Sequence, residues 1–194
     1  IFKFGGASVK DAEGVKNVLH VLNTVGHEDV LLVISAMGKT TNALEVVIKN
    51  YFDKSKELHA SLQEVRKYHN QILLDLFEDE EHDVFFDVNA HFDDLEYFIR
   101  SNKSPNYSFV YDQVVSIGEL VSTTIVSHYF NSQGMLNHWI DVRPLIKTDN
   151  NYRDAQVDWE TTQKLISKGV KKKTLNITQG FLGSDENNFT TTLG

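Results

Sequence analysis

The sequence of 194 residues lacks several features that would point to particular classes of protein. It has no cysteine, which excludes a disulfide framework and thiolate chemistry. Its one basic run is a lysine triplet at 171–173 and its net charge is −8, which argues against non-specific nucleic-acid binding. No signal peptide or apolar stretch of membrane-spanning length is recognisable. We therefore expect a cytoplasmic protein without membrane or nucleic-acid partners.

The composition is that of an ordinary globular protein, with 41% hydrophobic and 24% charged residues. A chain of this length can bury a substantial core, as one domain or one and a half. It begins at Ile1 without a methionine and ends in a small polar cluster at 190–194. We expect a fragment that lacks a few residues in front and a larger part behind.

The first eight residues carry the most information. A short apolar run that includes Lys3 breaks at Gly5 and Gly6, and a helical pattern follows at 11–25. Ser8, three residues ahead of Asp11, is predicted to form a capping box at the start of that helix. A glycine turn before a helix N-terminus exposes backbone N–H groups that bind anions, and Lys3 adds a positive charge. The alternative is an ordinary strand-to-helix turn with a surface lysine.

Hydrophobic periodicity predicts strands separated by helices. The strands are expected at 30–34, 135–140 and 174–178, and the helices at 43–52, 58–76, 84–99, 109–130 and 159–167. This alternation predicts a parallel sheet with right-handed crossovers. The helical stretch from about 53 to 108 is expected to form an insert beside the sheet.

Glycines and hydroxyl groups gather where the predicted strands end. Three predicted loops have this character, namely 5–8, 35–42, and 179–183 together with 190–194. Ligands of open α/β sheets bind at such strand ends, and this chemistry suits a phosphate ligand with magnesium. Residues 38–40 read Gly-Lys-Thr but lack the upstream glycine of a Walker motif, so they are a weak signal alone.

Six short motifs occur in the order expected of aspartate kinase, which the chain resembles over nearly its whole length. They are KFGGAS at 3–8, SAMGKTTN at 35–42, GELVST at 118–123, DVR at 141–143, QGFLG at 179–183 and TTTLG at 190–194. The resemblance implies the amino-acid kinase fold, a three-layer α/β/α sandwich with a mainly parallel sheet. It also implies ATP-dependent phosphorylation of the β-carboxylate of L-aspartate, the entry step to lysine, threonine and methionine synthesis.

The resemblance also implies residue roles. Lys3 would be catalytic, stabilising charge on the transferred phosphoryl group. The nucleotide and phosphate site would comprise Lys3, Gly5, Gly6, Ser8, Thr191, Thr192 and Gly194. Glu119 would be the counter-ion of the substrate ammonium, with Ser35 and Thr41 close to the substrate. Magnesium would be held by ATP phosphates and water, with no metal site built by the protein.

Some of these residues have plainer interpretations. Glu119 on a long helix could be a solvated surface carboxylate, although its apolar neighbours favour a buried position. Arg143, beside Pro144, could simply anchor a loop. The eight histidines show no metal-ligand spacing, which makes a zinc site improbable.

The chain departs from the family pattern in two ways. Ala7 stands where the family usually has threonine, so one hydroxyl near the phosphates is missing. The chain also stops before the family's Arg-x-Gly-Ser-Asp motif, its adenine-binding part and its regulatory domains. We expect residues 1–194 to be one portion of a single catalytic domain, inactive alone, in a full-length protein that is a homo-oligomer.

Two alternatives remain at this stage. One is another enzyme of the same fold, such as a glutamate, acetylglutamate or uridylate kinase. The other is a non-catalytic nucleotide-binding or interaction domain.

Overall fold

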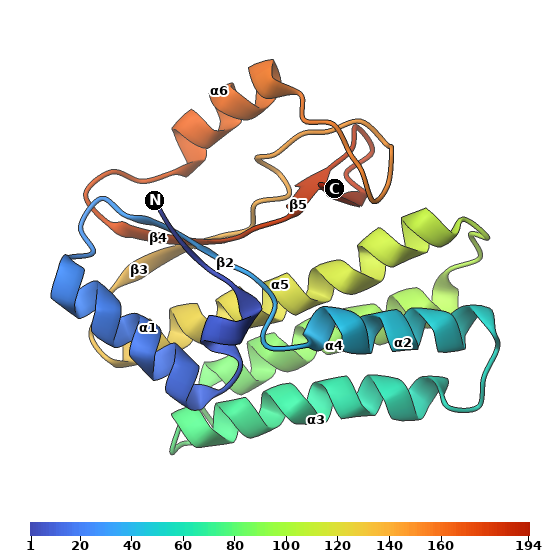
Figure 1. Cartoon of the computed structure of the whole chain (residues 1–194), viewed down its shortest axis with the longest axis horizontal. Helices are drawn as coiled ribbons and strands as arrows, with labels where there is room; N and C mark the ends of the chain where they lie inside the picture. The colour runs from blue at the N-terminus through green and yellow to red at the C-terminus, as the bar shows by residue number, and fades with distance from the viewer.

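Four short strands lie parallel to one another in the order β1, β2, β4, β3 (Figure 1). In the computed structural model, which describes all 194 residues, their bounds are Phe2–Phe4, Leu31–Ile34, Leu175–Gln179 and Asn137–Ile140 for β1, β2, β4 and β3. Strand β2 is wholly apolar, whereas the other three strands also contain polar residues. Parallel pairing requires crossover connections, and helices supply them here. The predicted parallel sheet is confirmed.

Helices cover both faces of this sheet, which confirms the three-layer architecture. Leu32, Ile34 and Ile177 point to one face and are fully buried there, on the side of α5 (Tyr107–Ser132) and α1 (Ala12–Val25). Helix α6 (Trp159–Gly169) crosses the opposite face (Figure 1). The alternation of side chains along each strand makes this two-sided packing possible.

Helix α5 is the central element of the molecule. From Val110 to Phe130 almost every residue is buried, because the sheet lies on one side and helices lie on the other. These helices are α2 (Thr40–Phe52), α3 (Leu58–Leu76) and α4 (Asp83–Ser101). A helix that is buried all round has no polar face toward water. The polar residues of this segment, such as Asp112, Glu119 and Ser122, are therefore buried as well. Helices α3 and α4 occupy the range in which the sequence predicts an insert.

The N-terminal turn differs from the predicted capping box. Residues Gly6–Val9 form a 3₁₀ turn, η1, and Ser8 lies within it. The cap of α1 is Asp11, whose Oδ1 accepts a hydrogen bond of 2.8 Å from the N–H of Gly14. The predicted cap at Ser8 is therefore wrong. An aspartate at the N-cap satisfies the first turn without help from a residue further upstream.

The segments 179–183 and 190–194, predicted as loops, contain strands. Residues Leu182–Ser184 (β5) and Thr190–Thr192 (β6) pair antiparallel as a small hairpin. The turn between them is organised by the buried Asp185, whose Oδ1 accepts from the N–H groups of Asn187 and Phe189, each at 2.9 Å. Strands of three residues are too short to leave a periodic signal in a sequence.

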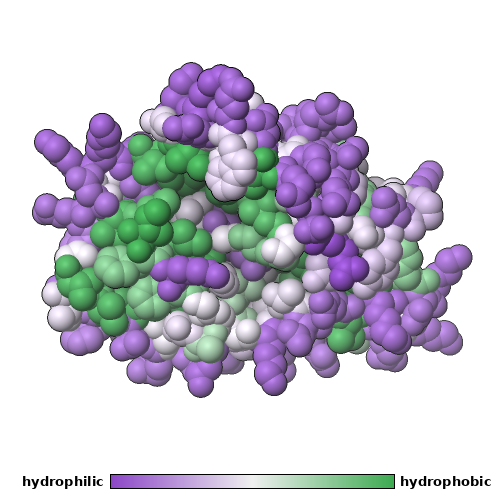
Figure 2. All heavy atoms as spheres, turned by 45° about the horizontal axis from the view of Figure 1, so that its top comes forward, coloured by the Kyte–Doolittle hydropathy of each residue, from purple (hydrophilic) through white to green (hydrophobic).

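Apolar side chains remain exposed on the face that carries α6. Figure 2 turns this face forward and shows hydrophobic side chains (green) gathered beside α6, with hydrophilic residues (purple) around them. A cavity of about 190 Å³ lies between the sheet and α6, and its lining includes Leu31, Val33, Ile166 and Val170. This face of the sheet is therefore less completely covered than the face against α5. No helix of the molecule has the length and apolar character needed to cross a membrane.

The close approach of α5 to the segment after β2 yields a first prediction. A Cβ atom at Gly118 would lie 2.9 Å from Ala36 Cβ and 3.2 Å from Thr40 Cγ2. In a free helix Gly→Ala is stabilising by about 1 kcal/mol, whereas overpacking a core costs about 1–3 kcal/mol. Because the cost exceeds the gain, we expect Gly118→Ala to lower the free energy of unfolding by up to about 2 kcal/mol in denaturant titration. As a control, Lys67→Ala at an exposed helix position should change it by less than about 0.5 kcal/mol. Stabilisation by Gly118→Ala would contradict the packing described.

Candidate active site

The three predicted loops meet at one edge of the sheet. Gly5, Ser35 and Gly180 directly follow β1, β2 and β4, whose carboxyl ends lie side by side. Backbone hydrogen bonds join them, because the N–H of Ser35 donates to Phe4 O at 3.1 Å and the N–H of Gly180 donates to Ile34 O at 3.4 Å. This edge is where ligands of parallel α/β sheets bind.

The two glycines of the first loop serve different purposes. A Cβ at Gly6 would lie 2.5 Å from Ala36 O and 2.9 Å from Gly38 O, so only glycine fits there. The N–H of Gly38 donates to Gly6 O at 2.9 Å, which fixes the first loop against the second. A Cβ at Gly5 would meet no atom within 4 Å, so the backbone there faces open space. The sequence predicted both glycines for their approach to phosphate and missed the packing requirement at Gly6.

Lys3 and Ser8 are exposed on either side of the glycines. Lys3 pairs in register with Val33 and so shares the face of the sheet that α6 crosses. Ser8 donates its backbone N–H to Gly5 O at 2.9 Å and keeps its hydroxyl at the surface of η1. Both side chains are available to a ligand placed over this edge.

Glu119 is the most unusual group of the site. Its side chain lies in the middle of α5, the residue is only 5% exposed, and its Oε1 accepts a hydrogen bond from the N–H of Ala36 at 3.3 Å. Burial raises the pKa of this carboxyl to about 7, partly opposed by backbone hydrogen bonds. None of the ion pairs in the structure includes Glu119. The predicted buried position is confirmed, and the surface interpretation is excluded.

The structure also brings Ser35 to the same place. One turn beyond Glu119, the hydroxyl of Ser122 donates to Ser35 O at 2.8 Å, so α5 holds the segment after β2 through two contacts. Thr41 is half-buried in the first turn of α2. The neighbouring Thr40, which the sequence did not single out, is buried and donates to Met37 O at 2.6 Å. These contacts give residues 35–41 a fixed shape at the edge of the sheet.

The threonines of β6 have their hydroxyls turned into the protein. Thr192 Oγ1 donates to Asp112 Oδ1 at 2.7 Å, and Thr191 Oγ1 lies 2.8 Å from Thr148 Oγ1. Both threonines are fully buried. Gly194 lies against Asp154, where a Cβ would be 2.5 Å from Oδ1. The phosphate-binding role of these residues stays a prediction, and their hydroxyls already have partners.

Gln179 and Arg143, which belong to two further motifs, both make contacts within the fold. Gln179 Nε2 donates to Thr123 Oγ1 at 2.7 Å and its Oε1 accepts from the N–H of Val142 at 2.9 Å, so it joins α5 to the end of β3. Arg143 makes a two-pronged contact with Asp141, with Nε–Oδ1 and Nη2–Oδ2 distances of 2.9 and 2.6 Å. These contacts favour the interpretation of Arg143 as a loop anchor.

The model of the amino acid kinase family matches residues 1–194, which is the whole chain. The chain belongs to this family. The bifunctional aspartokinase/homoserine dehydrogenase 2 of Escherichia coli strain K12 is 27% identical over 197 residues, covering 100% of this chain and 24% of that protein. The aspartokinase of Chlamydia trachomatis is 25% identical over 195 residues, covering 100% of this chain and 42% of that protein.

A solved structure shows the same fold. E. coli aspartokinase III, crystallised with lysine and aspartate, superposes with a TM-score of 0.85 at 25% identity, over 99% of this chain and 43% of that one. The chain therefore spans less than half the length of the relatives and the solved structure compared with it. Family membership accounts for the three-layer fold.

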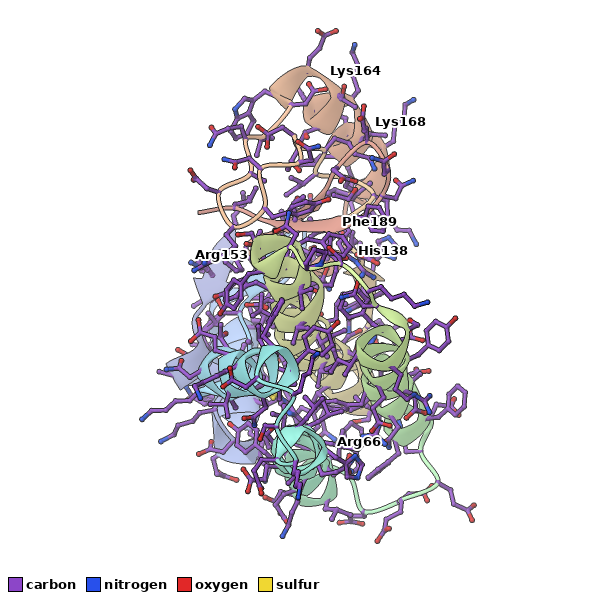
Figure 3. All side chains as sticks on the ribbon, turned by 90° about the vertical axis from the view of Figure 1, so that its right-hand side faces the viewer. Arg66, His138, Arg153, Lys164, Lys168 and Phe189 are labelled. Atoms are coloured by element: carbon purple, nitrogen blue, oxygen red, sulfur yellow. The ribbon has the colours of Figure 1, made fainter.

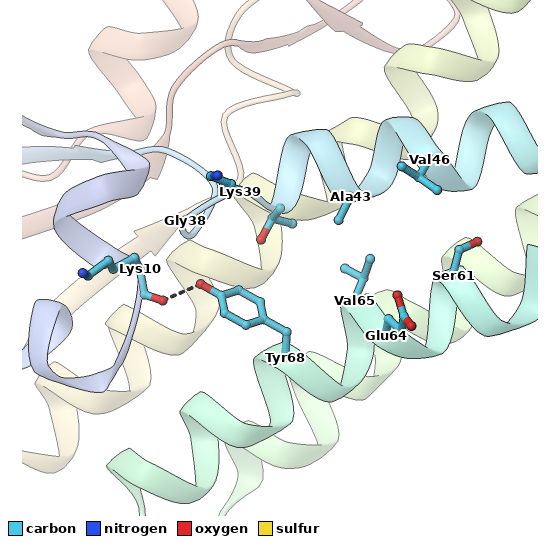
Figure 4. A pocket seen from close by; sticks show the side chains of 10 residues that line it. Lys10, Gly38, Lys39, Ala43, Val46, Ser61, Glu64, Val65 and Tyr68 are labelled. Atoms are coloured by element: carbon cyan, nitrogen blue, oxygen red, sulfur yellow. Dashed lines mark hydrogen bonds between the residues drawn. The ribbon is translucent and has the colours of Figure 1, made fainter.

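A large cavity lies beside the second loop of the predicted site, on its α2 and α3 side. It measures about 530 Å³, lies between α2, α3 and residues 38–40, and is shown in Figure 4. Ala43, Val46 and Val65 form its apolar part, and the Tyr68 hydroxyl beside it donates to Lys10 O. No residue predicted to bind substrate or phosphate lines it. We place the site at the strand ends, because the backbone N–H groups and the buried carboxylate converge there.

The donors at this edge suit an anionic ligand more than a bare cation. Backbone N–H groups, hydroxyls and Lys3 surround the glycine turn, and no cluster of three or more His, Asp or Glu side chains is arranged to hold a metal ion. Magnesium in such a site would be bound chiefly by the phosphate oxygens that these donors hold.

The raised pKa of Glu119 yields a second prediction. Between pH 4.5, the ordinary value of the carboxyl, and about 7, its value in the fold, the folded protein holds a proton that the unfolded chain has released. Stability should therefore fall as the pH rises through this window, by about 3 kcal/mol in total. Glu119→Gln should remove this dependence and be more stable than wild type at pH 8, measured by urea titration at several pH values. Exposed Glu28, changed to Gln, is the control. Parallel pH profiles for wild type and Glu119→Gln would show that the buried carboxyl titrates normally.

Proposed function

We propose that the protein carrying this chain is an aspartate kinase, which transfers the γ-phosphoryl group of ATP to the β-carboxylate of L-aspartate. The observation that carries the proposal is the buried carboxylate of Glu119, which has no cationic partner and lies beside the segment after β2. A buried charge without a partner is costly, so a site of this kind is suited to a ligand that brings a cation. The α-ammonium group of an amino acid is such a cation. The similarity to aspartokinases over the whole chain supports aspartate as that amino acid.

The proposed reaction needs little covalent chemistry from the protein. An oxygen of the aspartate β-carboxylate attacks the γ-phosphorus, the bond from that phosphorus to the bridging oxygen of ADP breaks, and ADP leaves with the bonding electrons. Positioning and charge neutralisation dominate such transfers. Lys3 and the N–H groups at Gly5 and Gly6 stand at the end of β1, where they would hold the phosphates. Magnesium, bound to those phosphates, would neutralise further charge.

The ammonium and the Glu119 carboxyl are linked in this scheme. A cation placed against the carboxylate lowers its pKa, whereas burial raises it to about 7. Near neutral pH, binding of aspartate would therefore be accompanied by release of a proton from Glu119. This gives the counter-ion role a signature that a purely structural carboxylate would lack.

The proposal is tested by aspartate-dependent ADP release in a coupled assay, using the full-length protein that carries this chain. Glu119→Ala should weaken the use of aspartate by about 2–5 kcal/mol in kcat/KM while leaving the KM for ATP nearly unchanged. The exposed Glu28→Ala variant is the matched control. If ADP is released with glutamate, acetylglutamate or uridylate and not with aspartate, that compound is the substrate and the proposal is wrong. Full aspartate activity in Glu119→Ala would remove the ammonium role.

A separate prediction concerns Lys3. Its charge should matter most when negative charge shifts during transfer, so Lys3→Ala should lower kcat by about 100-fold or more and raise the KM for aspartate far less. Lys56→Ala, at another exposed lysine, should behave as wild type. An unchanged kcat in Lys3→Ala would exclude this lysine from the transfer step.

A further inference from the structure

We propose that Asp112 is a positioning residue for the nucleotide side of the site, because it holds β6 in register beside α5. This inference rests on the proposed kinase function, in which residues 190–194, comprising β6 and the two residues after it, face the phosphates. Asp112 belongs to none of the six motifs, and it lies near the start of α5.

Three hydrogen bonds converge on this one carboxylate. Asp112 Oδ2 accepts from the N–H of Thr192 at 2.8 Å and from the N–H of Arg153 at 3.0 Å. Asp112 Oδ1 accepts from Thr192 Oγ1 at 2.7 Å. The residue is fully buried, so these bonds are shielded from competition with water. Burial raises its pKa, and the bonds from Thr192 and Arg153 oppose that shift.

The next residue, Gln113, adds two hydrogen bonds to β6, and we call Asp112 and Gln113 together the clamp on β6. Its Nε2 donates to Thr190 O at 2.7 Å and its Oε1 accepts from the N–H of Thr190 at 3.2 Å. Strand β6 pairs with β5 along one edge only, so its other edge needs partners for its backbone groups. Asp112 and Gln113 supply them as a neighbouring strand would, and the N–H of Ala155 donates to Thr192 O at 3.1 Å.

Aromatic and cationic side chains pack against the start of α5. Figure 3 labels Arg153 and Phe189 on either side of this helix. The guanidinium of Arg153 lies 4.5 Å from the ring centroid of Tyr111, and the ring of Phe189 lies 5.1 Å from that of Phe109. Both contacts involve residues of α5 that neighbour Asp112, so the helix holds β6 and the segment around Arg153 together.

Asp112 lies on the same helix as Glu119, which connects the clamp to the proposed substrate site. Asp112 and Glu119 are seven residues apart on one helix, which is about two turns and about 10 Å. Residues at this spacing share a helix face. A single rigid element therefore fixes the strand on the nucleotide side and the carboxylate proposed for the substrate ammonium at a constant separation.

Replacement of Asp112 by Asn tests whether its hydrogen bonds or its negative charge are needed. Its amide oxygen can accept both backbone N–H groups, and its NH₂ can donate to Thr192 Oγ1 once the hydroxyl turns to act as an acceptor. Position is then preserved without the charge. Ala removes all three bonds. Comparison of Asp112→Asn with Asp112→Ala therefore separates a role in positioning from a role that needs the negative charge, such as binding of magnesium.

The experiment uses the full-length protein and two readouts, steady-state kinetics and calorimetric titration with ADP and magnesium. Asp112→Ala should weaken ADP binding and raise the KM for ATP by about tenfold, and change the KM for aspartate by less than about threefold. Asp112→Asn and the exposed control Asp75→Ala should stay within about threefold of wild type in every value. If Asp112→Ala does not fold, Gln113→Ala removes the Thr190 contacts alone and should show the same split in smaller measure.

The outcomes separate this inference from the proposed function. Wild type that binds ADP but does not phosphorylate aspartate overturns the proposed substrate, while the ADP affinities of the variants still test the clamp. Asn as damaging as Ala would mean that the charge of Asp112 is needed, and would overturn a positioning role. Unchanged ADP affinity in a folded Asp112→Ala protein would overturn it as well, as would an equal loss for ATP and aspartate.

Discussion

The contact between helix α5 and the segment that follows β2 is the constraint on which the rest of the structure depends. Gly118 permits it, because any side chain there would meet Ala36 at 2.9 Å. With the helix this close, Glu119 reaches the N–H of Ala36 and Ser122 reaches the carbonyl of Ser35. The same helix lies under the sheet and clamps β6. One glycine therefore decides the distance between the central helix and the edge where the loops meet.

This arrangement leaves a carboxylate in an environment that disfavours its charge. Backbone hydrogen bonds, chiefly the one from Ala36, only partly offset the loss of water around Glu119, so burial raises its pKa to about 7. A group of this kind does not stabilise the fold in its charged form. Under the proposed function its place in the core is understandable, because the substrate ammonium would supply the missing counter-charge.

The sequence predicted the large elements well because each has a local pattern. The helix expected at 109–130 extends over Tyr107–Ser132, and the strand expected at 30–34 over Leu31–Ile34. The clamp at Asp112 could not be predicted, because its partner Thr192 lies 80 residues away along the chain and no spacing encodes that pairing. The hairpin of β5 and β6 was missed for another reason, because strands of three residues leave no periodic signal. The predicted cap at Ser8 failed because Asp11 caps the helix itself.

The side-chain clamp on β6 also decides where other strands can add to the molecule. Exposed backbone groups at a sheet edge invite another strand to pair with them. The outer edge of β6 is already saturated, by Asp112, Gln113 and the N–H of Ala155. The four-stranded sheet, in contrast, has two edge strands that pair on one side only, β1 and β3, and Phe2 of β1 is 37% exposed. An added strand is thus blocked at the hairpin, whereas the edges at β1 and β3 leave room for one.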